Sequence, residues 1–286
     1  MQTIIGKKMT FFIILFIIAF LFYVLYKGNK SIQTTRVCIV SSKIPASFEG
    51  FRIVQVSDLH NAEFGDRQMR LLRTIKEASP DLIAVTGDLI DSRHTNIEKA
   101  MEFVSGAVKV APVYYVTGNH EARTDKFQNL KNRMEKAGAV ILRNSGICIF
   151  RGNDSIELLG LEDPAFANLN GKNEENAARA EVELKKIPKK NATYTILLSH
   201  RPELIDVYRA NGIDLALCGH AHGGQIRLPY IGGLFAPNQG FLPKYSEEIH
   251  KKGRTEMVVS RGLGNSLAPV RIHNRPEIVV ITLSKG

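Results

Sequence analysis

Aspartate, histidine and asparagine side chains, which can all bind metal ions, recur along this sequence in five short motifs. The motifs are Asp58-Leu59-His60, Gly87-Asp88, Gly118-Asn119-His120-Glu121, the single His200, and Gly219-His220-Ala221-His222. Carboxylate, imidazole and amide groups together suit manganese, iron or zinc, whereas magnesium and calcium prefer ligands that are all oxygen. Because a carboxylate can bridge two ions about 3.5–4 Å apart, as hydrolytic centres with two metals require, the set predicts a site for two divalent ions.

Each motif follows a short apolar run that is typical of a buried β-strand. The runs are residues 51–57, 81–86, 113–116, 195–199 and 213–218. Side chains two residues apart point to the same side of a strand, so Asp58 and His60 face one way, as do His220 and His222. A single histidine is more often a core residue with its hydrogen bonds satisfied, but chance would not place five motifs after apolar strands. Open α/β sheets carry their chemistry at strand ends, and we expect the motifs to converge there.

Strands and helices alternate in the first half of the chain. The pattern predicts strands over 37–40, 51–56, 81–86 and 113–116, and helices over 66–78, 96–108 and 125–137. This βαβα order indicates a largely parallel sheet. Beyond Gly138, strands are predicted over 139–142, 147–150, 156–161, 193–199, 213–218, 255–260 and 277–283, with helices over 174–187 and 203–210. We expect these later strands to form a second sheet that packs on the first, with helices outside.

The N-terminal region carries most of the excess positive charge. Of 286 residues, 38 are basic and 28 acidic, which gives a formal net charge of +10. Residues 1–43 hold six of the basic residues and no acidic one, so the rest of the chain has an excess of only four. Met9–Tyr26 is an uncharged segment that, as a helix, would span about 27 Å, close to the roughly 30 Å core of a bilayer. The charge therefore favours a membrane surface as partner, and no nucleic acid is expected.

No small-x-small cleavage motif follows Tyr26, so the sequence favours an uncleaved anchor over a removed signal peptide. The chain then divides into a basic tail (1–8), a transmembrane anchor (9–26), a polar tether (27–36) and one globular domain (37–286). Lysines flank the anchor on both sides, so the positive-inside rule hardly distinguishes the two possible orientations in the membrane. We expect a single-pass protein of the cell membrane with its globular domain on the extracytoplasmic side.

The five motifs, in this order, resemble those of the calcineurin-like metallophosphoesterases, and the resemblance extends from Phe51 to the C-terminus. It implies an α/β fold in four layers, an α/β/β/α sandwich of two mixed β-sheets flanked by helices. It also implies which side chains bind each of two divalent ions (Mn, Fe or Zn), with Asp88 as the bridge. The first ion would be held by Asp58, His60, Asp88 and His222, and the second by Asp88, Asn119, His200 and His220.

His120 has a different role in this resemblance, because it lies over the phosphoryl group of the substrate and does not bind metal. Asp91, the second acid of Gly-Asp-x-x-Asp, would orient His120. Two divalent ions lower the pKa of a shared water, so a bridging hydroxide would attack phosphorus in line. His120 would stabilise the transition state or protonate the leaving oxygen.

Three further segments narrow the resemblance to a membrane-associated branch. They are the loop 223–245, the turn 260–264 and the segment 274–277. This branch includes YkuE- and YaeI-type phosphodiesterases and is similar to enzymes that split the pyrophosphate of UDP-2,3-diacylglucosamine. The resemblance therefore implies hydrolysis of a phosphodiester or pyrophosphate bond in a lipid-linked or nucleotide-containing substrate. The alternatives are a phosphomonoesterase or protein phosphatase with a soluble substrate, and a non-catalytic scaffold of the same fold.

The loop 223–245 is rich in apolar side chains, among them Phe235 and Phe241. A loop of this length is expected to be functional, and its apolar content argues against disorder. Two interpretations stay open: the loop walls the active site and contacts acyl chains or the bilayer, or it covers a sheet edge. Three arginines, Arg261, Arg271 and Arg275, could pair with phosphate, although arginines in loops are more often solvated.

Overall fold

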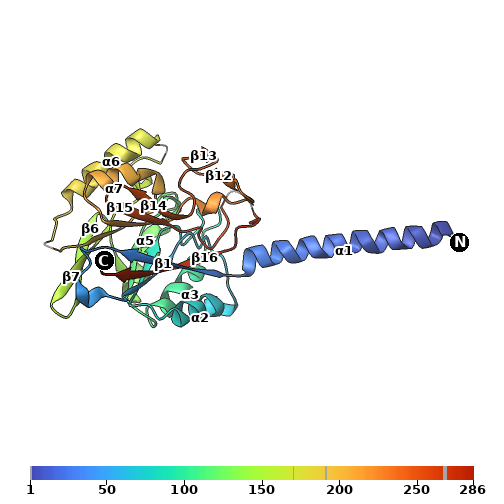
Figure 1. Ribbon diagram of the computed structural model, residues 1–286, viewed down its shortest axis with the longest axis horizontal. Coiled ribbons are helices and arrows are strands. Elements are labelled where there is room, and N and C mark those ends of the chain that lie inside the picture. The colour runs from blue at the N-terminus through green and yellow to red at the C-terminus, as the bar shows by residue number, and fades with distance from the viewer. Residues whose placement is uncertain (1, 170, 191, 267–268) are drawn as a thin grey trace.

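Two six-stranded β-sheets form the body of the computed structural model, which describes residues 2–169, 171–190, 192–266 and 269–286 (Figure 1). In order across the first sheet, the strands are β1 (Gln33–Val40), β16 (Glu277–Ser284), β2 (Arg52–Val56), β3 (Leu82–Thr86), β4 (Val113–Val116) and β5 (Val140–Ile141). Across the second they are β14 (Glu248–Lys252), β15 (Thr255–Val259), β9 (Leu215–Cys218), β8 (Thr195–Leu198), β7 (Asp154–Gly160) and β6 (Ser145–Arg151). Both sheets are mixed, since β16 runs antiparallel to β2 while β2, β3 and β4 run parallel, and β7 is antiparallel to β6 but parallel to β8.

Alternate side chains of the strands enter two different cores, because successive residues of a strand face opposite sides. In β3, Leu82 and Ala84 pack between the two sheets, whereas Ile83 and Val85 pack on the helices outside the first sheet. Those helices are α2 (Met69–Glu77), α3 (Ile97–Ala107) and α5 (Phe127–Lys136), and the helices packed on the second sheet are α6 (Asn173–Lys186) and α7 (Ile205–Ala210). The predicted α/β/β/α sandwich of mixed sheets is confirmed.

Two predicted strands belong to the first sheet and not, as expected, to the second. β5 pairs with β4, and β16 lies between β1 and β2. The apolar residues of β16 are buried on both faces, with Ile278 and Val280 in the helix-side core and Val279 and Ile281 in the core between the sheets. A strand that is apolar on both faces buries the most apolar surface in the interior of a sheet. The order of strands along the chain does not reveal which sheet provides that position.

Short elements fill the connections. The 3-10 helices are η1 (Ala46–Phe48), η2 (Asp66–Gln68), η3 (Pro164–Phe166), η4 (Pro202–Leu204) and η5 (His222–Gly224), and the short helix α4 spans Asn119–Ala122. The loop 223–245 folds into two small hairpins, β10 (Arg227–Leu228) with β11 (Gly232–Gly233), and β12 (Phe235–Ala236) with β13 (Gly240–Phe241).

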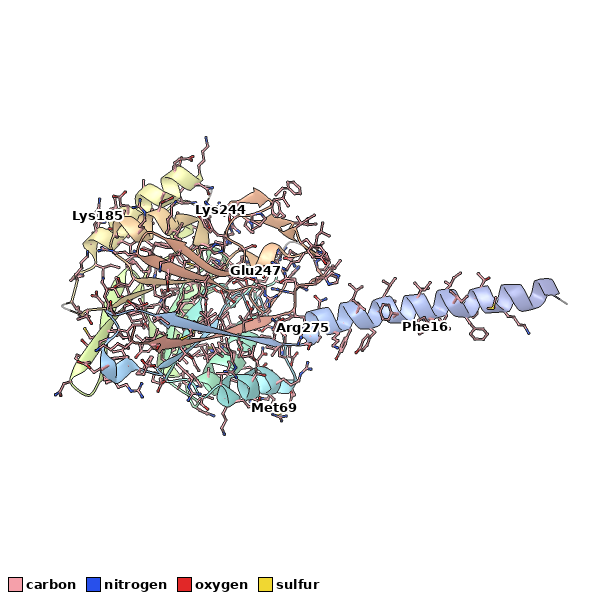
Figure 2. All side chains as sticks on the ribbon, viewed as in Figure 1. Phe16, Met69, Lys185, Lys244, Glu247 and Arg275 are labelled. Carbon is pink, nitrogen blue, oxygen red and sulfur yellow. The ribbon has the colours of Figure 1, made fainter. Side chains whose placement is uncertain are left out.

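Helix α1 (Gln2–Lys30) projects from one end of the domain as a single long rod (Figures 1 and 2). Its segment Lys8–Lys30 is long and apolar enough to cross a membrane, with a mean hydropathy of 2.7, and none of its most apolar stretch is buried against the domain. The polar tether expected over 27–36 is instead shared between the end of α1 and the start of β1. The reason is that Gln33–Val40 pairs along its whole length with β16.

The end of α1 is held to the domain by directed contacts. The side-chain oxygen of Asn29 accepts hydrogen bonds from the Arg271 backbone (3.1 Å) and the Asn265 side chain (3.0 Å). The guanidinium of Arg275, at the junction in Figure 2, donates to Ser31 (2.7 Å), and Lys30 donates to the carbonyl of Glu63 (3.2 Å). The helix therefore leaves the domain in a defined direction and does not hang on a free linker.

Asn29→Ala is expected to lower the free energy of unfolding of the domain by about 1–3 kcal/mol, because the donors on Arg271 and Asn265 lose their shared acceptor. Thermal unfolding of the full chain would measure the change. Asn132→Ala is the matched control, because the Asn132 side chain accepts a hydrogen bond from Gln128 on the exposed face of α5, away from any contact between elements. Equal, small effects of both substitutions would show that Asn29 does not secure the helix.

Candidate metal centre

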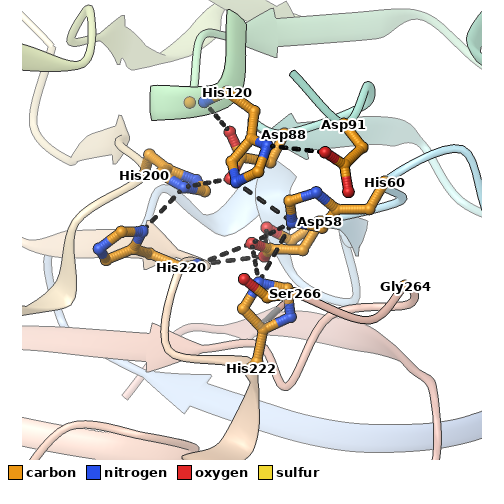
Figure 3. Close-up of polar contacts among 12 residues, drawn as sticks. Asp58, His60, Asp88, Asp91, His120, His200, His220, His222, Gly264 and Ser266 are labelled. Atoms are coloured by element: carbon orange, nitrogen blue, oxygen red, sulfur yellow. Dashed lines mark hydrogen bonds and ion pairs between the residues drawn. The ribbon is translucent and has the colours of Figure 1, made fainter. Parts of the chain in front are cut away.

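The five motifs directly follow β2, β3, β4, β8 and β9, so they meet at one end of the two facing sheets. Figure 3 shows the side chains of Asp58, Asp88, His200 and His222 close together. Every predicted ligand is buried, from Asp58 and His200 with no exposed surface to His60 with 7%. The structure brings together all nine residues singled out as candidates. Six of the seven predicted ligands fall into two adjacent clusters, and Asn119, the seventh, lies with them in the lining of the same hollow. The seven ligands are Asp58, His60, Asp88, Asn119, His200, His220 and His222.

The first cluster consists of Asp58, His60 and His222, each of which offers a ligand atom toward the same point. His222 Nε2 lies 3.2 Å from both Asp58 Oδ1 and His60 Nε2, and the last two atoms are 3.8 Å apart. Ligands about 2.1 Å from one ion stand roughly 3.0–3.4 Å from each other. The spacing of this cluster is therefore close to that of the inner ligands of a metal ion.

The second cluster consists of Asp88, His200 and His220. His200 Nε2 lies 3.2 Å from Asp88 Oδ2 and 3.2 Å from His220 Nδ1. Asp88 Oδ2 is also 3.5 Å from His60 Nε2, so this carboxylate stands between the two clusters. Asp88 is thus the residue whose position suits a bridge.

The hydrogen bonds around the clusters leave the right atoms free for metal. His200 Nδ1 donates to the carbonyl of Thr86 (2.7 Å), and His220 Nε2 donates to Asn238 Oδ1 (2.9 Å). In a neutral imidazole the other nitrogen then carries a lone pair. Asn119 Oδ1 is buried without a hydrogen-bond partner, an arrangement that costs free energy unless a cation fills it. These residues fit a pair of divalent ions.

The backbone of the ligand residues is unusual. Asp58, His60, Asp88, His220 and His222 all have positive φ, between 44° and 67°. Non-glycine residues rarely adopt this left-handed conformation, which costs free energy and concentrates at functional sites. Gly118 is required beside them, because a Cβ there would lie 2.2 Å from Asp88 Oδ1. The turns are therefore shaped to aim the ligands at the cost of local stability.

The buried carboxylates and histidines of the site shift the pKa values of different histidines in opposite directions. Burial by itself opposes ionisation of Asp88, but the neighbouring histidines, His200 first, lower the pKa of this carboxyl well below its ordinary value. Burial likewise opposes protonation of His200, yet Asp88 beside it raises the pKa of His200 to about 10, so a metal ion that binds Nε2 would displace a proton. Burial lowers the pKa of His222 to about 3, so that this imidazole is neutral and ready to bind metal.

His120 lies beside the first cluster, with its ring 4.4 Å from that of His60. The backbone N–H of Ser92 donates to His120 Nδ1 (3.0 Å), so the neutral ring carries its proton on Nε2. Burial lowers the pKa of His120 from its ordinary value, which favours the neutral ring at neutral pH. Its Nε2–H is therefore a hydrogen-bond donor at neutral pH.

Asp91, expected from the resemblance to orient His120, lies beside that ring without a hydrogen bond to it. Its Oδ1 is 3.6 Å from His120 Nδ1, too far for a hydrogen bond. The carboxylate instead binds the Arg93 side chain at 2.7 and 3.0 Å, and the Arg93 hydrogen bond opposes burial to lower the pKa of Asp91 to about 2. The hydrogen bond to His120 Nδ1 comes from Ser92, and the charge of Asp91 lies near the same atom, so an orienting role for Asp91 stays a prediction.

Glu121 is a buried supporting residue to which the sequence interpretation gives no role. Its carboxylate accepts from the backbone N–H groups of Gly118 (2.8 Å), Asp88 (2.9 Å) and Ile90 (3.3 Å). Burial, with Asp88 nearby, raises the pKa of Glu121 to about 7. Glu121 thus ties the β3 and β4 turns together, and its place in Gly-Asn-His-Glu is the sequence signal that could have revealed it.

The clusters open into a hollow of about 430 Å³, which we call the substrate hollow. Arg93 and Arg123 line it, together with Phe235, Pro237 and Asn238 of the loop 223–245. The loop therefore walls the site, as one of the two interpretations of the sequence expected.

The three arginines proposed from the sequence for phosphate do not line this hollow. Arg261 pairs with Glu277 (2.8 Å), Arg271 is buried against the carbonyls of Gly264 and Arg261, and Arg275 contacts the end of α1. Each has a structural partner at hand, which a sequence reading cannot see. Arg271 also lies 3.4 Å from His222 Nδ1, so it supports the first cluster from behind.

Arg201→Met is expected to lower the free energy of unfolding by about 3–5 kcal/mol, because it leaves the buried carboxylate of Asp163 unpaired. Arg201 binds Asp163 through two hydrogen bonds of 2.8 and 2.9 Å and also donates to Asn238 Oδ1, which holds His220. Chemical denaturation would measure the loss. Arg133→Met removes the same bidentate geometry from an exposed pair with Glu98 and should change stability little.

The pair also predicts a pH dependence. Burial opposes ionisation, but Arg201 lowers the pKa of Asp163 in the folded protein. The stabilisation is therefore fully present above the unfolded pKa of about 3.9 and is lost as the pH falls through the folded value. Arg201→Met should remove this part of the acid sensitivity, and an unchanged acid profile would contradict the assignment.

The sequence of this chain is similar to those of known proteins. The model of the calcineurin-like phosphoesterases matches residues 51–224. Metallophosphoesterase YkuE of Bacillus subtilis is 32% identical over 91% of this chain and 88% of its own length. Phosphodiesterase YaeI of Escherichia coli is 29% identical over 82% of each chain. A zebrafish (Danio rerio) transmembrane protein with a metallophosphoesterase domain is 28% identical over 92% of this chain and 60% of its own length.

Proposed function

This chain belongs to the calcineurin-like phosphoesterase family, and on that premise we propose that it hydrolyses phosphodiester or pyrophosphate bonds with two divalent ions (Mn, Fe or Zn) bound. The observation that carries the proposal is Asp88, whose Oδ2 lies within 3.5 Å of a histidine nitrogen from each cluster. When bound, such ions supply a Lewis acid for phosphoryl oxygens and activate water at neutral pH.

The residues of the chain then have separate roles in this proposal. Asp58, His60, Asp88 and His222 hold the first ion, and Asp88, Asn119, His200 and His220 hold the second. His120 points its Nε2–H at the phosphoryl group, either at a non-bridging oxygen or at the leaving oxygen. Arg123 lines the substrate hollow and supplies positive charge for the rest of a diphosphate or phosphodiester, whereas Arg93, also in the lining, is paired with Asp91.

We propose that the substrate is either a lipid-linked molecule held in the membrane or a molecule that contains a nucleotide. Helix α1 is a candidate anchor of suitable length, and one relative is named a transmembrane protein and another a phosphodiesterase. A phosphomonoesterase acting on soluble substrates is the second candidate, because the substrate hollow of about 430 Å³ also has room for a small monoester.

The test is metal-dependent turnover by the full chain. The protein would be stripped of metal and supplied with Mn, Fe, Zn, Mg or Ca, and hydrolysis of bis-4-nitrophenyl phosphate compared with that of 4-nitrophenyl phosphate. Activity with Mn, Fe or Zn and preference for the diester support the proposal. Preference for the monoester would favour the second candidate, and no turnover of either substrate with two ions bound would contradict both.

We further propose that the domain lies on the extracytoplasmic side of the membrane, and Cys38 offers the measurement. Cys38 is an exposed free thiol near the start of the domain, whereas Cys218 is buried. Cys148 is half-buried and would first be replaced by serine. In that background a membrane-impermeant maleimide should label Cys38 in intact cells and should not label the chain that also carries Cys38→Ser. Labelling that occurs only after the membrane is broken would place the domain in the cytoplasm.

A further inference from the structure

A second, apolar hollow of about 240 Å³ adjoins the substrate hollow and is here called the apolar groove. Its apolar side is made by Ile226, Leu234, Phe235, Pro237 and Phe241 from the loop 223–245. His222, Phe235, Pro237 and Ser266 line both hollows, so the groove begins at a predicted metal ligand. A molecule with its phosphate at the metals could therefore extend an attached chain along the groove.

The chemistry of the groove fits a hydrocarbon chain. The Phe235 and Phe241 rings meet edge to face with centroids 5.5 Å apart, and Phe241 is 83% exposed. An open groove with apolar walls gains free energy by burying apolar surface. A nucleoside or sugar would leave its polar groups without partners there.

Helix α1, the candidate anchor, leaves the domain beside the groove. Asn29 lies three residues, about 4.5 Å along the helix, beyond Tyr26, the last residue of the apolar segment. Its side chain holds Asn265, the neighbour of the groove residue Ser266. Figure 1 shows β12 and β13 at the same end of the domain from which α1 leaves. Leu242, next to Phe241, is a further exposed apolar residue at this end.

We propose that the apolar groove binds one acyl or alkyl chain of a lipid substrate while its phosphodiester or pyrophosphate lies in the substrate hollow. The proposal rests on the proposed function and names the part of the substrate that the groove selects. It makes the loop 223–245 a specificity element: the chain enters from the bilayer surface, beside α1, and passes Phe241 before it reaches Phe235 and the metal ligands.

Chain length is the variable that tests the proposal. Methyl, butyl and hexyl 4-nitrophenyl phosphate diesters share one leaving group and differ only in the chain. With the full chain in phosphatidylcholine nanodiscs, kcat/KM should rise by up to about fourfold for each methylene that the groove buries. We expect at least about a tenfold gain from methyl to hexyl. Phe241→Ser opens the groove and Leu234→Trp fills it. In both variants the gain in kcat/KM from methyl to hexyl should fall to under about threefold.

Ile231→Ser is the matched control. Ile231 is also an exposed apolar residue of the loop, at 60%, but it lines a different hollow, beside Tyr230 and His273. It should keep the full chain-length gain. The same gain in all variants would mean that partition into the bilayer produces it, and no gain in the wild type would mean that the groove binds no chain. Either result overturns the proposal.

Dissociation constants of monomethyl, monobutyl and monohexyl phosphate, measured by calorimetry, give the same comparison without turnover. Tighter binding of the hexyl compound, lost in Phe241→Ser and kept in Ile231→Ser, supports the groove even where no diester is hydrolysed, and in that case only the proposed function fails. Hydrolysis without any effect of chain length has the opposite meaning: it supports the proposed function and contradicts the proposal for the groove.

Discussion

Asp88→Asn is expected to abolish turnover and metal binding together. The carboxylate is shared in three directions: Oδ2 lies 3.5 Å from His60 Nε2 and 3.2 Å from His200 Nε2, and Oδ1 accepts from the His120 backbone at 2.8 Å. An amide has one oxygen and an NH₂ group that cannot bind metal. We expect kcat to fall by at least about 10³-fold, since losing a single oriented electrostatic group already costs 10²–10³.

Metal content, measured after gel filtration, should fall from two ions per chain to one or none. Circular dichroism would establish that the variant is folded. Two ions retained with full activity would refute the bridging role of Asp88.

Asp91→Asn is the matched control for charge alone. Asp91 is also an aspartate beside the histidines, and His60, Asp91 and His120 lie close enough to form a group of their own. Its carboxylate, however, is bound by Arg93. We expect both ions to remain and kcat to fall by no more than about tenfold, since Asp91 makes no hydrogen bond to His120 and only a neighbouring charge is lost. Loss of an ion in Asp91→Asn would show that Asp91 is a ligand.

The convergence of the ligands could be predicted because it follows from strand ends. Asp58 and His222 are far apart in the chain, yet their ligand atoms stand 3.2 Å apart, because β2 and β9 end at the same edge of the facing sheets. Apolar runs locate such strands, and the residues that follow them are read directly from the sequence. The layers of the fold follow from the same alternation.

The supporting contacts could not be predicted, because they depend on how loops return to the site. Asn238, which fixes the His220 ring, comes from the tip of the β12–β13 hairpin, and Arg271 reaches His222 from a segment that also holds α1. Neither belongs to a motif. The Ser92 contact depends on the turn that follows Asp88, where Asp91 is the more prominent residue in the motif. Such partners are set by tertiary structure and leave no periodic signal.

His120→Ala is expected to lower kcat by about 10²–10⁴-fold while both ions stay bound, since no ligand is removed. The Ser92 N–H on Nδ1 leaves Nε2–H as the donor, and burial lowers the pKa of His120 below 6.5. The neutral ring then has no further proton to lose near neutral pH. The wild-type rate should therefore stay level between about pH 6.5 and 8, whereas a required imidazolium would make the rate decline over this range. A rate that falls across this range and flattens in His120→Ala would contradict the neutral donor.

The leaving group decides which oxygen His120 serves. If Nε2–H protonates the leaving oxygen, the loss in His120→Ala should be largest for an alkyl diester and small for a 4-nitrophenyl diester, whose leaving group needs no proton. If it binds a non-bridging oxygen, the loss should be similar for both, and His120→Gln, which keeps an N–H donor, should recover part of the rate. Because the ring is neutral and fixed by a backbone donor, we expect the second pattern. A loss confined to the alkyl diester would instead make His120 the general acid and would require a proton supply that a neutral Nε2–H must regain at each turnover.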